Sequence, residues 1–290
     1  TPPRTGRIGL THALTPTEGM LSEFTVARLA EGRAYLTSAA AAEEIDWDLL
    51  RDFAVGHDVS LRNVSEDWAV IGVMGPLARD LLQQLPNGAE ARTPRDLDFD
   101  ANLPWLSVQE CELAGAPVRA LRVSYIGELG WELHVPHSHA APLFDQLWEA
   151  GHPLGVHLYG AFAANSMRLE KGYRAWGADL TTERSPAEAG LGAFVKSSLL
   201  ERANTWDMAL LEIETDGTDP FYSHPVLSGD KVIGIVTSGA FGHRTQKTLA
   251  LAYLRDPERD DLSVEILGQR RRATILDNPP YDPENVRLKA

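Results

Sequence analysis

Cysteine and long apolar runs are almost absent from this sequence of 290 residues. The single cysteine, Cys111, excludes an internal disulfide and any metal site built from several cysteines. It is typical of a reducing compartment, so we expect a cytoplasmic protein, or one of the mitochondrial matrix if the source is eukaryotic. Because Cys111 lies in a strand-like stretch, "LSVQECELAGAPV", we predict a buried and unreactive thiol. No apolar run approaches the roughly 20 residues that a membrane helix needs, so no membrane association is expected.

Positive charge is also scarce. Lysine and arginine together number 27 against 41 acidic residues, which gives a net charge of −14. A surface of this sign repels nucleic acid, so no nucleic-acid partner is expected. An anionic small molecule is still compatible with the sequence, because a few local arginine or lysine side chains outweigh a distant field at short range.

Nucleotide-binding and hydrolase motifs are missing as well. There is no P-loop and no G-x-S-x-G elbow, and the glycines of "VIGVMGPLA" do not have the spacing of a dinucleotide-binding fingerprint. His134, His137 and His139 flank Pro136 at the end of a predicted strand with no carboxylate in register, which favours surface histidines over a metal site. We expect no bound metal and no FAD-binding unit within this sequence.

Strand and helix patterns divide the chain into three predicted domains, 1–65, 66–205 and 206–290. In the first, residues 6–39 have the pattern of three strands, separated by the Gly-containing loops "TPTEG" and "AEGR". A helix is predicted in "AAAAEEIDWDLLRDFAVGH", with Ile45, Leu49 and Phe53 on one apolar stripe.

The second and third domains differ in their patterns. From residue 66 the order is strand, helix, three strands and helix, which predicts an antiparallel sheet with helices on one face rather than a doubly wound sheet. From about Leu210 only short strands follow, separated by Gly and Asp turns, which predicts a small β-barrel or sandwich. The fold class is therefore α+β with an all-β C-terminal domain.

Glu23 is the first candidate for a chemical role. In "MLSEFTVARL", strict strand alternation places Leu21, Glu23 and Thr25 on one face and Phe24 and Val26 on the other. On the pattern alone, Glu23 is either a solvated edge carboxylate or, if it faces a cleft, a group that accepts and donates protons.

The stretch "RVSYIGELGWELHVP" carries a second set of candidates. Tyr125 and Glu132 lie seven residues apart on either side of "IGELG", so a hairpin would bring them near one another. An aromatic ring stacks on a flat heterocycle, and a carboxylate accepts two adjacent N–H donors of an amino-pyrimidinone. The alternative is that Tyr125 and Trp131 belong to the core and that both glutamates, Glu128 and Glu132, are solvated.

A third stretch, residues 166–196, places Arg168, Lys171 and Arg174 near a helix end, and Trp176 follows them. A solvated helix face explains the charges. It does not explain the irregular "GYRAWG" and "SPAEAGLG" that come next, and irregular backbone is where sites tend to lie. By themselves, the residues predict a multi-domain protein with a pocket for a heterocycle and no particular reaction.

Three segments, in the right order, resemble the folate-binding aminomethyltransferase family, which includes the T-protein of the glycine cleavage system. They are "RVSYIGELGWELHVP", "NSMRLEKGYRAWGADLTTERSPAEAGLGAFVK" and "GIVTSGAFGHRTQKTLALAYL". The resemblance covers nearly the whole chain. "THALTP", "GYRAWGADLT" and the closing "NPPYDPENVRLKA" make it strongest to the C-terminal folate domains of FAD-dependent dimethylglycine and sarcosine dehydrogenases.

The resemblance implies a cloverleaf of ferredoxin-like α+β domains with a C-terminal β-barrel, and tetrahydrofolate in its centre. The family's first strand–helix unit would precede Thr1, so we expect that unit to be missing from this sequence. FAD is expected only in a missing N-terminal half or in a partner flavoprotein.

By position, the resemblance assigns the one-carbon chemistry to Glu23, which stands where T-proteins have an essential Asp. It assigns folate contacts to six further residues, namely Leu10, Thr37, Tyr125, Glu132, Arg174 and Trp176. Two positions depart from the family. Relatives often have Tyr at the position of Leu10, and T-proteins have Arg at the position of Ala164, which argues against a glycine-cleavage role.

The implied function is tetrahydrofolate-dependent one-carbon transfer. We expect the chain to capture the methylene unit of an N-methylated amine of the dimethylglycine or sarcosine type and to form 5,10-methylenetetrahydrofolate, as the C-terminal part of an FAD-dependent dehydrogenase. Arg122, Arg174 and Arg244 are candidates for binding the glutamate tail of the folate. Three alternatives stay open: a stand-alone aminomethyltransferase, a folate-dependent demethylase, and a folate-binding module without turnover.

Overall fold

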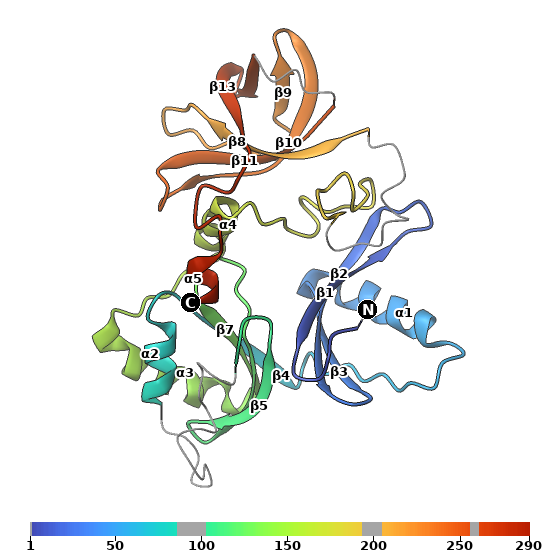
Figure 1. Cartoon of the computed structure of the whole chain (residues 1–290), viewed down its shortest axis with the longest axis vertical. Helices are drawn as coiled ribbons and strands as arrows, with labels where there is room; N and C mark the ends of the chain where they lie inside the picture. Colours follow the sequence, from blue (N-terminus) through green and yellow to red (C-terminus); the bar gives the residue numbers. More distant parts are fainter. Residues whose placement is uncertain (1, 86–102, 193–204, 256–260) are drawn as a thin grey trace.

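Three lobes make up the computed structural model of the chain (Figure 1). A three-stranded sheet and a four-stranded sheet lie side by side, and a closed β-barrel lies beyond them at one end of the long axis. The structure describes residues 2–85, 103–192, 205–255 and 261–290. The predicted α+β class with a C-terminal barrel is confirmed, and the domain boundaries at 65/66 and 205/206 stay a prediction.

The first lobe is an antiparallel sheet in the order β1-β2-β3. Its strands are β1 (Ile8–Leu14), β2 (Met20–Ala30) and β3 (Arg33–Thr37), which confirms the three strands predicted for this region. A 3-10 turn, η1 (Ala40–Ala42), and helix α1 (Glu43–Ala54) follow. Two of the three residues in the apolar stripe of α1 face solvent rather than a core, and Leu49 is partly buried. Ile45 and Phe53 are 57% and 61% exposed, and Asp46 is the helix residue that is buried.

The second lobe is a four-stranded antiparallel sheet in the order β4-β7-β6-β5. Its elements confirm the predicted order of strand, helix, three strands and helix. They are β4 (Trp68–Met74), α2 (Ala78–Gln84), β5 (Val108–Leu113), β6 (Ala116–Leu121), β7 (Gly130–Pro136) and α3 (His137–Gly151), with a 3-10 turn η2 (His152–Leu154) after them. One face of the sheet packs on α2 and α3, where Trp131, Leu133 and Val135 of β7 are fully buried.

The thiol of Cys111 lies on β5 beside this core. It is half-buried rather than fully buried. Burial raises the pKa of Cys111 to about 12, so the thiol stays protonated at neutral pH, as expected for an unreactive cysteine.

The remaining faces of the two sheets pack against each other. Directly opposite residues of an antiparallel pair point to the same side, so Ile8 and Ala27 share a face with Tyr35, and Val108 shares a face with Leu121. The buried side chains Ile8, Ala27, Val108 and Leu121 form one apolar cluster between the sheets. This cluster determines which polar side chains of the two sheets confront each other.

The third lobe follows helix α4 (Ala161–Glu170) and an irregular segment. Its strands close into a barrel in the order β10-β11-β8-β13-β12-β9, which confirms the barrel that the short strands predicted. They are β8 (Asp207–Ile213), β9 (Pro225–Ser228), β10 (Lys231–Gly242), β11 (Lys247–Leu254), β12 (Leu262–Ile266) and β13 (Gln269–Leu276).

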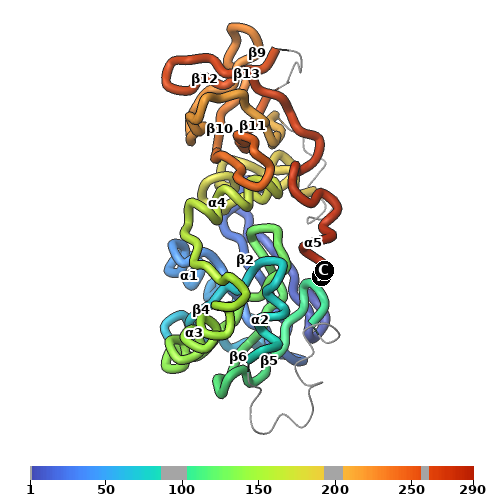
Figure 2. Tube along the Cα trace, turned by 90° about the vertical axis from the view of Figure 1, so that its left-hand side faces the viewer, coloured from blue at the N-terminus to red at the C-terminus, as the bar shows by residue number. Residues whose placement is uncertain are grey.

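The C-terminal end returns from the barrel to the second lobe, where the short helix α5 (Val286–Lys289) lies (Figures 1 and 2). The carbonyl of Ala290 accepts hydrogen bonds from Arg79 at 2.7 Å and from Arg122 at 2.5 Å. Lys171 donates to the carbonyl of Asp282 at 2.6 Å and so ties the exit of α4 to the same tail. Among the described residues, none of the helices has both the length and the hydropathy that a membrane-spanning segment requires.

Candidate functional site

Glu23 lies on β2 and faces the second lobe. Residues 20, 22 and 24 of the strand are buried and residues 21, 23 and 25 are partly exposed, which confirms the predicted alternation. His12 of β1 stands directly opposite Glu23, and its Nε2 is 2.9 Å from Oε2 of the glutamate. The side chain of Glu23 is 27% exposed and that of His12 is 3% exposed. Glu23 is therefore a histidine-bonded carboxylate rather than a solvated edge residue.

Leu10 and Thr37 share this face with Glu23. Thr25 pairs with both of them across the sheet, and it lies two residues from Glu23 on the same strand. Leu10 is 40% exposed, and Thr37 is partly exposed. The register thus brings three of the predicted site residues to one surface of the first lobe.

Glu132 lies on the confronting face of the second lobe. It pairs with Leu121, which belongs to the apolar cluster between the sheets, and its side chain is 29% exposed. Oε2 of Glu132 is 3.4 Å from Nε2 of His134, and Nδ1 of His134 is 3.1 Å from the hydroxyl of Tyr35 on the first lobe. If the tyrosine hydroxyl donates to Nδ1, the proton on Nε2 is directed at the carboxylate.

The burial of His134 corrects the sequence interpretation. The three histidines around Pro136 were expected at the surface, and His137 is indeed exposed, but His134 is 1% exposed. Its strand neighbours alternate between the two faces of a sheet that is covered on both sides, so a polar residue on the inner face becomes buried once the first lobe packs there. Burial raises the pKa of Tyr35, and Arg119 opposes this shift.

Arg119 completes the polar contacts between the sheets. Its guanidinium lies 4.6 Å from the ring centre of Tyr35 and 3.9 Å from that of Trp68, distances typical of cation–π contacts. Its Nε also donates to Glu110 at 3.1 Å. These contacts hold Tyr35 in the position from which it reaches His134.

Tyr125 lies in the connection between β6 and β7 rather than on a hairpin arm. β6 ends at Leu121 and β7 begins at Gly130, so the expected tight turn at "IGELG" does not form. The hydroxyl of Tyr125 donates to the carbonyl of Arg174 at 3.3 Å, and its ring stacks on Tyr173 with centroids 6.4 Å apart. The ring is not part of the core, since Tyr125 is 42% exposed.

The charge of Glu23 reaches Tyr125. Burial raises the pKa of Tyr125 to about 12, and among the smaller influences is the negative charge of Glu23. The acid on β2 and the ring on the 122–129 connection therefore lie within electrostatic range of one another.

Glu128 explains why the connection departs from a hairpin. It is buried, and it accepts hydrogen bonds from Arg244 at 3.1 Å and from the hydroxyl of Tyr281. Gly127 has a φ of 75°, and a Cβ there would lie 2.1 Å from the Lys171 side chain, so only glycine fits. Of the two glutamates in the motif, Glu128 anchors the lobe to the barrel and Glu132 stays partly exposed.

Trp176 and Arg174 lie in the irregular segment after α4. The indole of Trp176 donates to the carbonyl of Leu21 at 3.1 Å, which places it beside Glu23. Arg174 donates to the carbonyls of Ala189 at 2.9 Å and Gly172 at 3.2 Å, and burial lowers its pKa. A ligand carboxylate would have to compete with these carbonyls, and the assignment of Arg174 to a folate tail stays a prediction.

The other two tail candidates are also engaged within the protein. Arg122 is 3% exposed and donates to the carbonyls of Leu103 at 2.9 Å and Ala290 at 2.5 Å. Arg244 donates to Glu170 and Glu128 at the junction with the barrel. Both guanidiniums hold lobes together in this structure.

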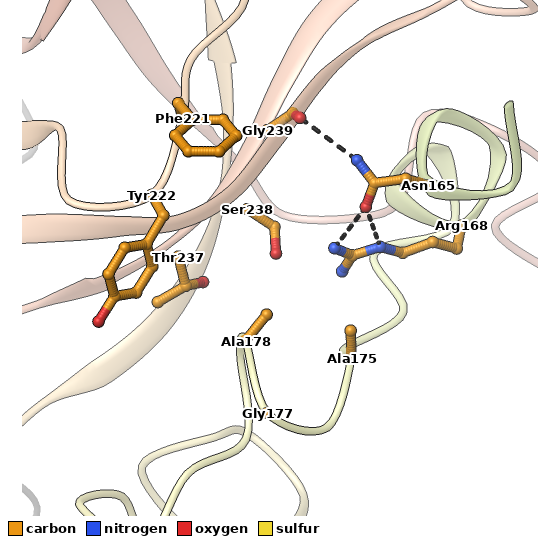
Figure 3. Close-up of a pocket in the computed structure, with 10 residues that line it drawn as sticks. All are labelled: Asn165, Arg168, Ala175, Gly177, Ala178, Phe221, Tyr222, Thr237, Ser238 and Gly239. Carbon is orange, nitrogen blue, oxygen red and sulfur yellow. Dashed lines mark hydrogen bonds between the residues drawn. The ribbon is translucent and has the colours of Figure 1, made fainter. Parts of the chain in front are cut away.

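A cavity of about 430 Å³ lies between α4 and the barrel (Figure 3). Asn165 accepts two hydrogen bonds from Arg168 and donates to the carbonyl of Gly239 at 3.4 Å, so the polar groups beside the cavity bond to one another. The exposed rings of Phe221 and Tyr222 lie at its other side. None of the seven predicted site residues lines this cavity.

Four of the residues that line this cavity belong to an anchoring network centred on the buried Asp179. The carboxylate of Asp179 accepts hydrogen bonds from Arg168 at 2.6 Å, from the backbone N–H of Ala175 at 2.8 Å, from Ser238 at 2.6 Å and from the hydroxyl of Thr237. These bonds connect α4, the irregular segment and β10. The network explains the conspicuous "GYRAWGAD" stretch as a lobe junction.

Three site residues escaped the sequence interpretation: His12, Tyr35 and His134. Tyr35 and His134 become visible only through packing between the lobes, because Tyr35 reaches His134 from another sheet. The sequence did contain a signal for His12. If the first two predicted strands form a hairpin, His12 lies on the strand next to Glu23 and on the same face of the sheet.

Comparison with known proteins identifies the family of the chain. Residues 1–198 match the family model of the GCVT N-terminal domain, and residues 207–282 match that of the glycine cleavage T-protein C-terminal barrel domain. The chain therefore belongs to the glycine cleavage T-protein family of aminomethyltransferases.

The similar proteins include dehydrogenases and aminomethyltransferases. The chain is 33% identical to dimethylglycine dehydrogenase of Rattus norvegicus over 99% of its own length and 35% of that protein, and 30% identical to sarcosine dehydrogenase of Mus musculus over 93% and 33%. It thus spans about a third of these dehydrogenases. It is also 30% identical to an aminomethyltransferase of Streptomyces avermitilis, over 95% of this chain and 77% of that protein.

The fold has a solved counterpart. The aminomethyltransferase T of the glycine cleavage system from Bartonella henselae superposes with a TM-score of 0.80 at 22% identity, over 97% of this chain and 77% of that one. The likeness confirms the fold.

Proposed function

We propose that this chain transfers a one-carbon unit to a reduced folate. The observation that carries the proposal is the placement of Glu23 and Glu132 on the confronting faces of two sheets, each partly exposed and each bonded to one histidine. A carboxylate held through one oxygen keeps the other oxygen available to a ligand. Two such acids on facing surfaces allow one to bind a flat ligand while the other exchanges protons with it.

The side chains around the two acids fit a reduced pterin. A pterin has an amino-pyrimidinone edge with adjacent N–H donors, which a carboxylate accepts as a pair. We assign this contact to Glu132. Leu10, Tyr125 and Trp176 supply partly exposed apolar and aromatic surface for the flat ring, and Thr37 lies beside Leu10 on the same face.

Tetrahydrofolate, when bound, supplies the two nitrogens N5 and N10 to which a methylene carbon is joined. The carbon is brought in as the iminium of the donor amine, so its bond to the amine nitrogen breaks while two carbon–nitrogen bonds form. Two protons pass from the folate nitrogens to the departing amine, which balances atoms and charge without an oxidant. We assign these proton transfers to Glu23, and the product is 5,10-methylenetetrahydrofolate.

The donor we propose is an N-methylated amine of the dimethylglycine or sarcosine type. This is supported by relatives named dimethylglycine and sarcosine dehydrogenase that match nearly the whole chain. Oxidation of the N-methyl group to the iminium requires a flavin, which we place in another part of a longer polypeptide or in a partner subunit. A stand-alone aminomethyltransferase is the second candidate, supported by the relative from Streptomyces avermitilis, three quarters of which the chain covers.

The test is the rate at which the chain accelerates methylene transfer from formaldehyde to tetrahydrofolate over the uncatalysed reaction. We expect acceleration by the wild type, loss of it in Glu23→Gln, and no loss in Glu31→Gln, which changes an exposed acid in the turn after β2. Binding of tetrahydrofolate without acceleration would identify a folate-binding module instead. The proposal would be refuted if folded protein neither bound tetrahydrofolate nor accelerated the transfer.

A further inference from the structure

We propose that His12 is a positioning residue for Glu23, and that its Nε2–H bond selects which carboxylate oxygen does the chemistry. In this arrangement Nε2 of His12 donates to Oε2 of Glu23, and Oε1 is the oxygen that meets the reacting nitrogens. The inference rests on the proposed function, because it assigns a role in that reaction to a residue that neither the sequence nor the resemblance singled out.

The backbone fixes this pair. His12 and Glu23 are directly opposite partners in the β1–β2 ladder, so the separation of their Cβ atoms is set by the sheet rather than by mobile loops. The two side-chain atoms are 2.9 Å apart, a normal hydrogen-bond length. With 3% of its side chain exposed, His12 is shielded from water, whereas Glu23 is 27% exposed and reaches the surface that Leu10 and Thr37 share.

The chemistry of the partners determines the direction of the bond. An ionised carboxylate has lone pairs and no proton, so the histidine nitrogen that faces it has to carry one. A carboxylate bonded in this way loses the freedom to rotate and presents a single oxygen to the ligand side. That oxygen can take one proton from a folate nitrogen and pass it to the departing amine before it takes the second. This suits a reaction in which two protons leave the folate nitrogens in turn.

Glu132 is also bonded to a histidine, but its contact differs in length and geometry from the His12–Glu23 bond. The contact between Glu132 and His134 is longer, at 3.4 Å, and joins two residues on one strand rather than a cross-strand pair. It leaves Glu132 room to adjust to a bound ring, whereas the shorter bond at Glu23 fixes the oxygen that moves protons.

Three substitutions at His12 separate the positioning role from a general effect on folding. The amide nitrogen of Gln reaches the place of Nε2, that of Asn reaches only the place of Nδ1, and Leu has no donor. We expect His12→Leu and His12→Asn to lower kcat about 10- to 100-fold. This is at or below the lower end of the ~10²- to 10⁴-fold that acid–base catalysis contributes. His12→Gln should recover most of the rate. KM for tetrahydrofolate should change little, and His137→Gln, at an exposed histidine, is the matched control.

A readout that does not depend on turnover is the tautomer of His12 in the ligand-free protein. Long-range nitrogen–proton NMR on ¹⁵N-histidine-labelled protein reports which ring nitrogens carry protons, and the signal missing from His12→Gln identifies His12 among the nine histidines. We expect Nε2 to be protonated, with Nδ1 either bare or protonated. A bare Nε2 overturns the proposal.

The kinetic outcomes are equally decisive. The proposal is wrong if His12→Leu and His12→Asn keep the wild-type kcat, or if His12→Gln loses as much as His12→Leu at equal thermal stability. If the wild type shows no transfer at all, the proposed function has failed, and the tautomer measurement still decides whether the His12–Glu23 bond exists as described.

Discussion

Acidic residues at the lobe junction and on the facing sheets are held in two different ways. At the junction, Asp179 and Glu170 are 0% exposed, and Asp179 alone accepts bonds from a guanidinium, a backbone N–H and two hydroxyls. On the facing sheets, Glu23 and Glu132 are partly exposed, and each bonds to one histidine. A carboxylate saturated with internal donors stabilises the fold, whereas one with a remaining oxygen can serve a ligand.

The contrast occurs even within one motif. Glu128 and Glu132 are four residues apart in "GELGWE", yet Glu128 bonds to Arg244 and Tyr281 at the barrel and Glu132 lies on the inner face of β7. Residue type and spacing do not separate the two roles. Access to solvent does, because Glu128 is buried and the side chain of Glu132 is 29% exposed.

The largest expected effect comes from removing the proton-transferring oxygen. Glu23→Gln keeps the size of the side chain and its hydrogen bond to His12 but cannot accept a proton, so we expect kcat to fall by about 10²- to 10⁴-fold. Folate affinity and the unfolding midpoint should stay near wild type. Steady-state kinetics beside urea unfolding checks this, and a full-rate Glu23→Gln would remove Glu23 from the mechanism.

Asp179→Asn tests the junction. It leaves Arg168, which is 2% exposed, without its charged partner, and breaking a buried pair in this way costs about 3–5 kcal/mol. We expect that loss in the free energy of unfolding, measured in urea. A loss below about 1 kcal/mol would show that the network does not hold the lobes together.

Glu128→Gln and Glu132→Gln form a matched pair that sharpens the comparison. Glu132→Gln should raise the Kd for tetrahydrofolate about 10- to 100-fold, the weight of a charge-assisted bond, with little change in stability. Glu128→Gln should lower the free energy of unfolding by about 1–3 kcal/mol because Arg244 loses one of its two carboxylate partners and keeps only Glu170, with little change in Kd. If Glu128→Gln weakened folate binding and Glu132→Gln lowered the stability instead, the roles assigned to the two acids would be reversed.

Tyr35→Phe removes the hydroxyl that bonds to Nδ1 of His134. A net hydrogen bond contributes about 0.5–1.5 kcal/mol, so we expect the Kd for tetrahydrofolate to rise about 2- to 10-fold through a less ordered Glu132. The effect should vanish in the Glu132→Gln background, and a double-mutant cycle measures this. Additive effects would mean that Tyr35 does not act through Glu132.

The smallest effect is expected at Cys111. Since burial raises its pKa to about 12, above the ~8.5 of a free thiol, almost no thiolate is present at pH 8 in the folded protein. A thiol reagent at pH 8 should therefore react far more slowly with native than with guanidinium-unfolded protein. Equal rates would contradict the burial of the thiol.

Much of the fold was predictable because strands and turns leave local signals. Alternation placed Glu23 on one face of its strand and Phe24 on the other, and the Gly-containing loops marked the breaks between the first three strands. The pattern of short C-terminal strands predicted an all-β domain. The predicted site residues Leu10, Thr37 and Glu23 share a face because a hairpin meander preserves parity from strand to strand.

The features that the sequence did not predict depend on packing between lobes. The inner face of β7 buries His134 only because another sheet covers it, and the stripe of Ile45 and Phe53 on α1 faces solvent although its periodicity is that of a core helix. Glu128 is fixed by Arg244, 116 residues away in the chain. Such partners have no signature in local spacing.

The most direct test of the account is a calorimetric titration of the folded chain with tetrahydrofolate, wild type beside Glu132→Gln. The account predicts a single binding event in the wild type and an affinity about 10- to 100-fold weaker in the variant. It would be contradicted if folded wild-type protein showed no binding, or if the variant bound tetrahydrofolate as tightly as the wild type.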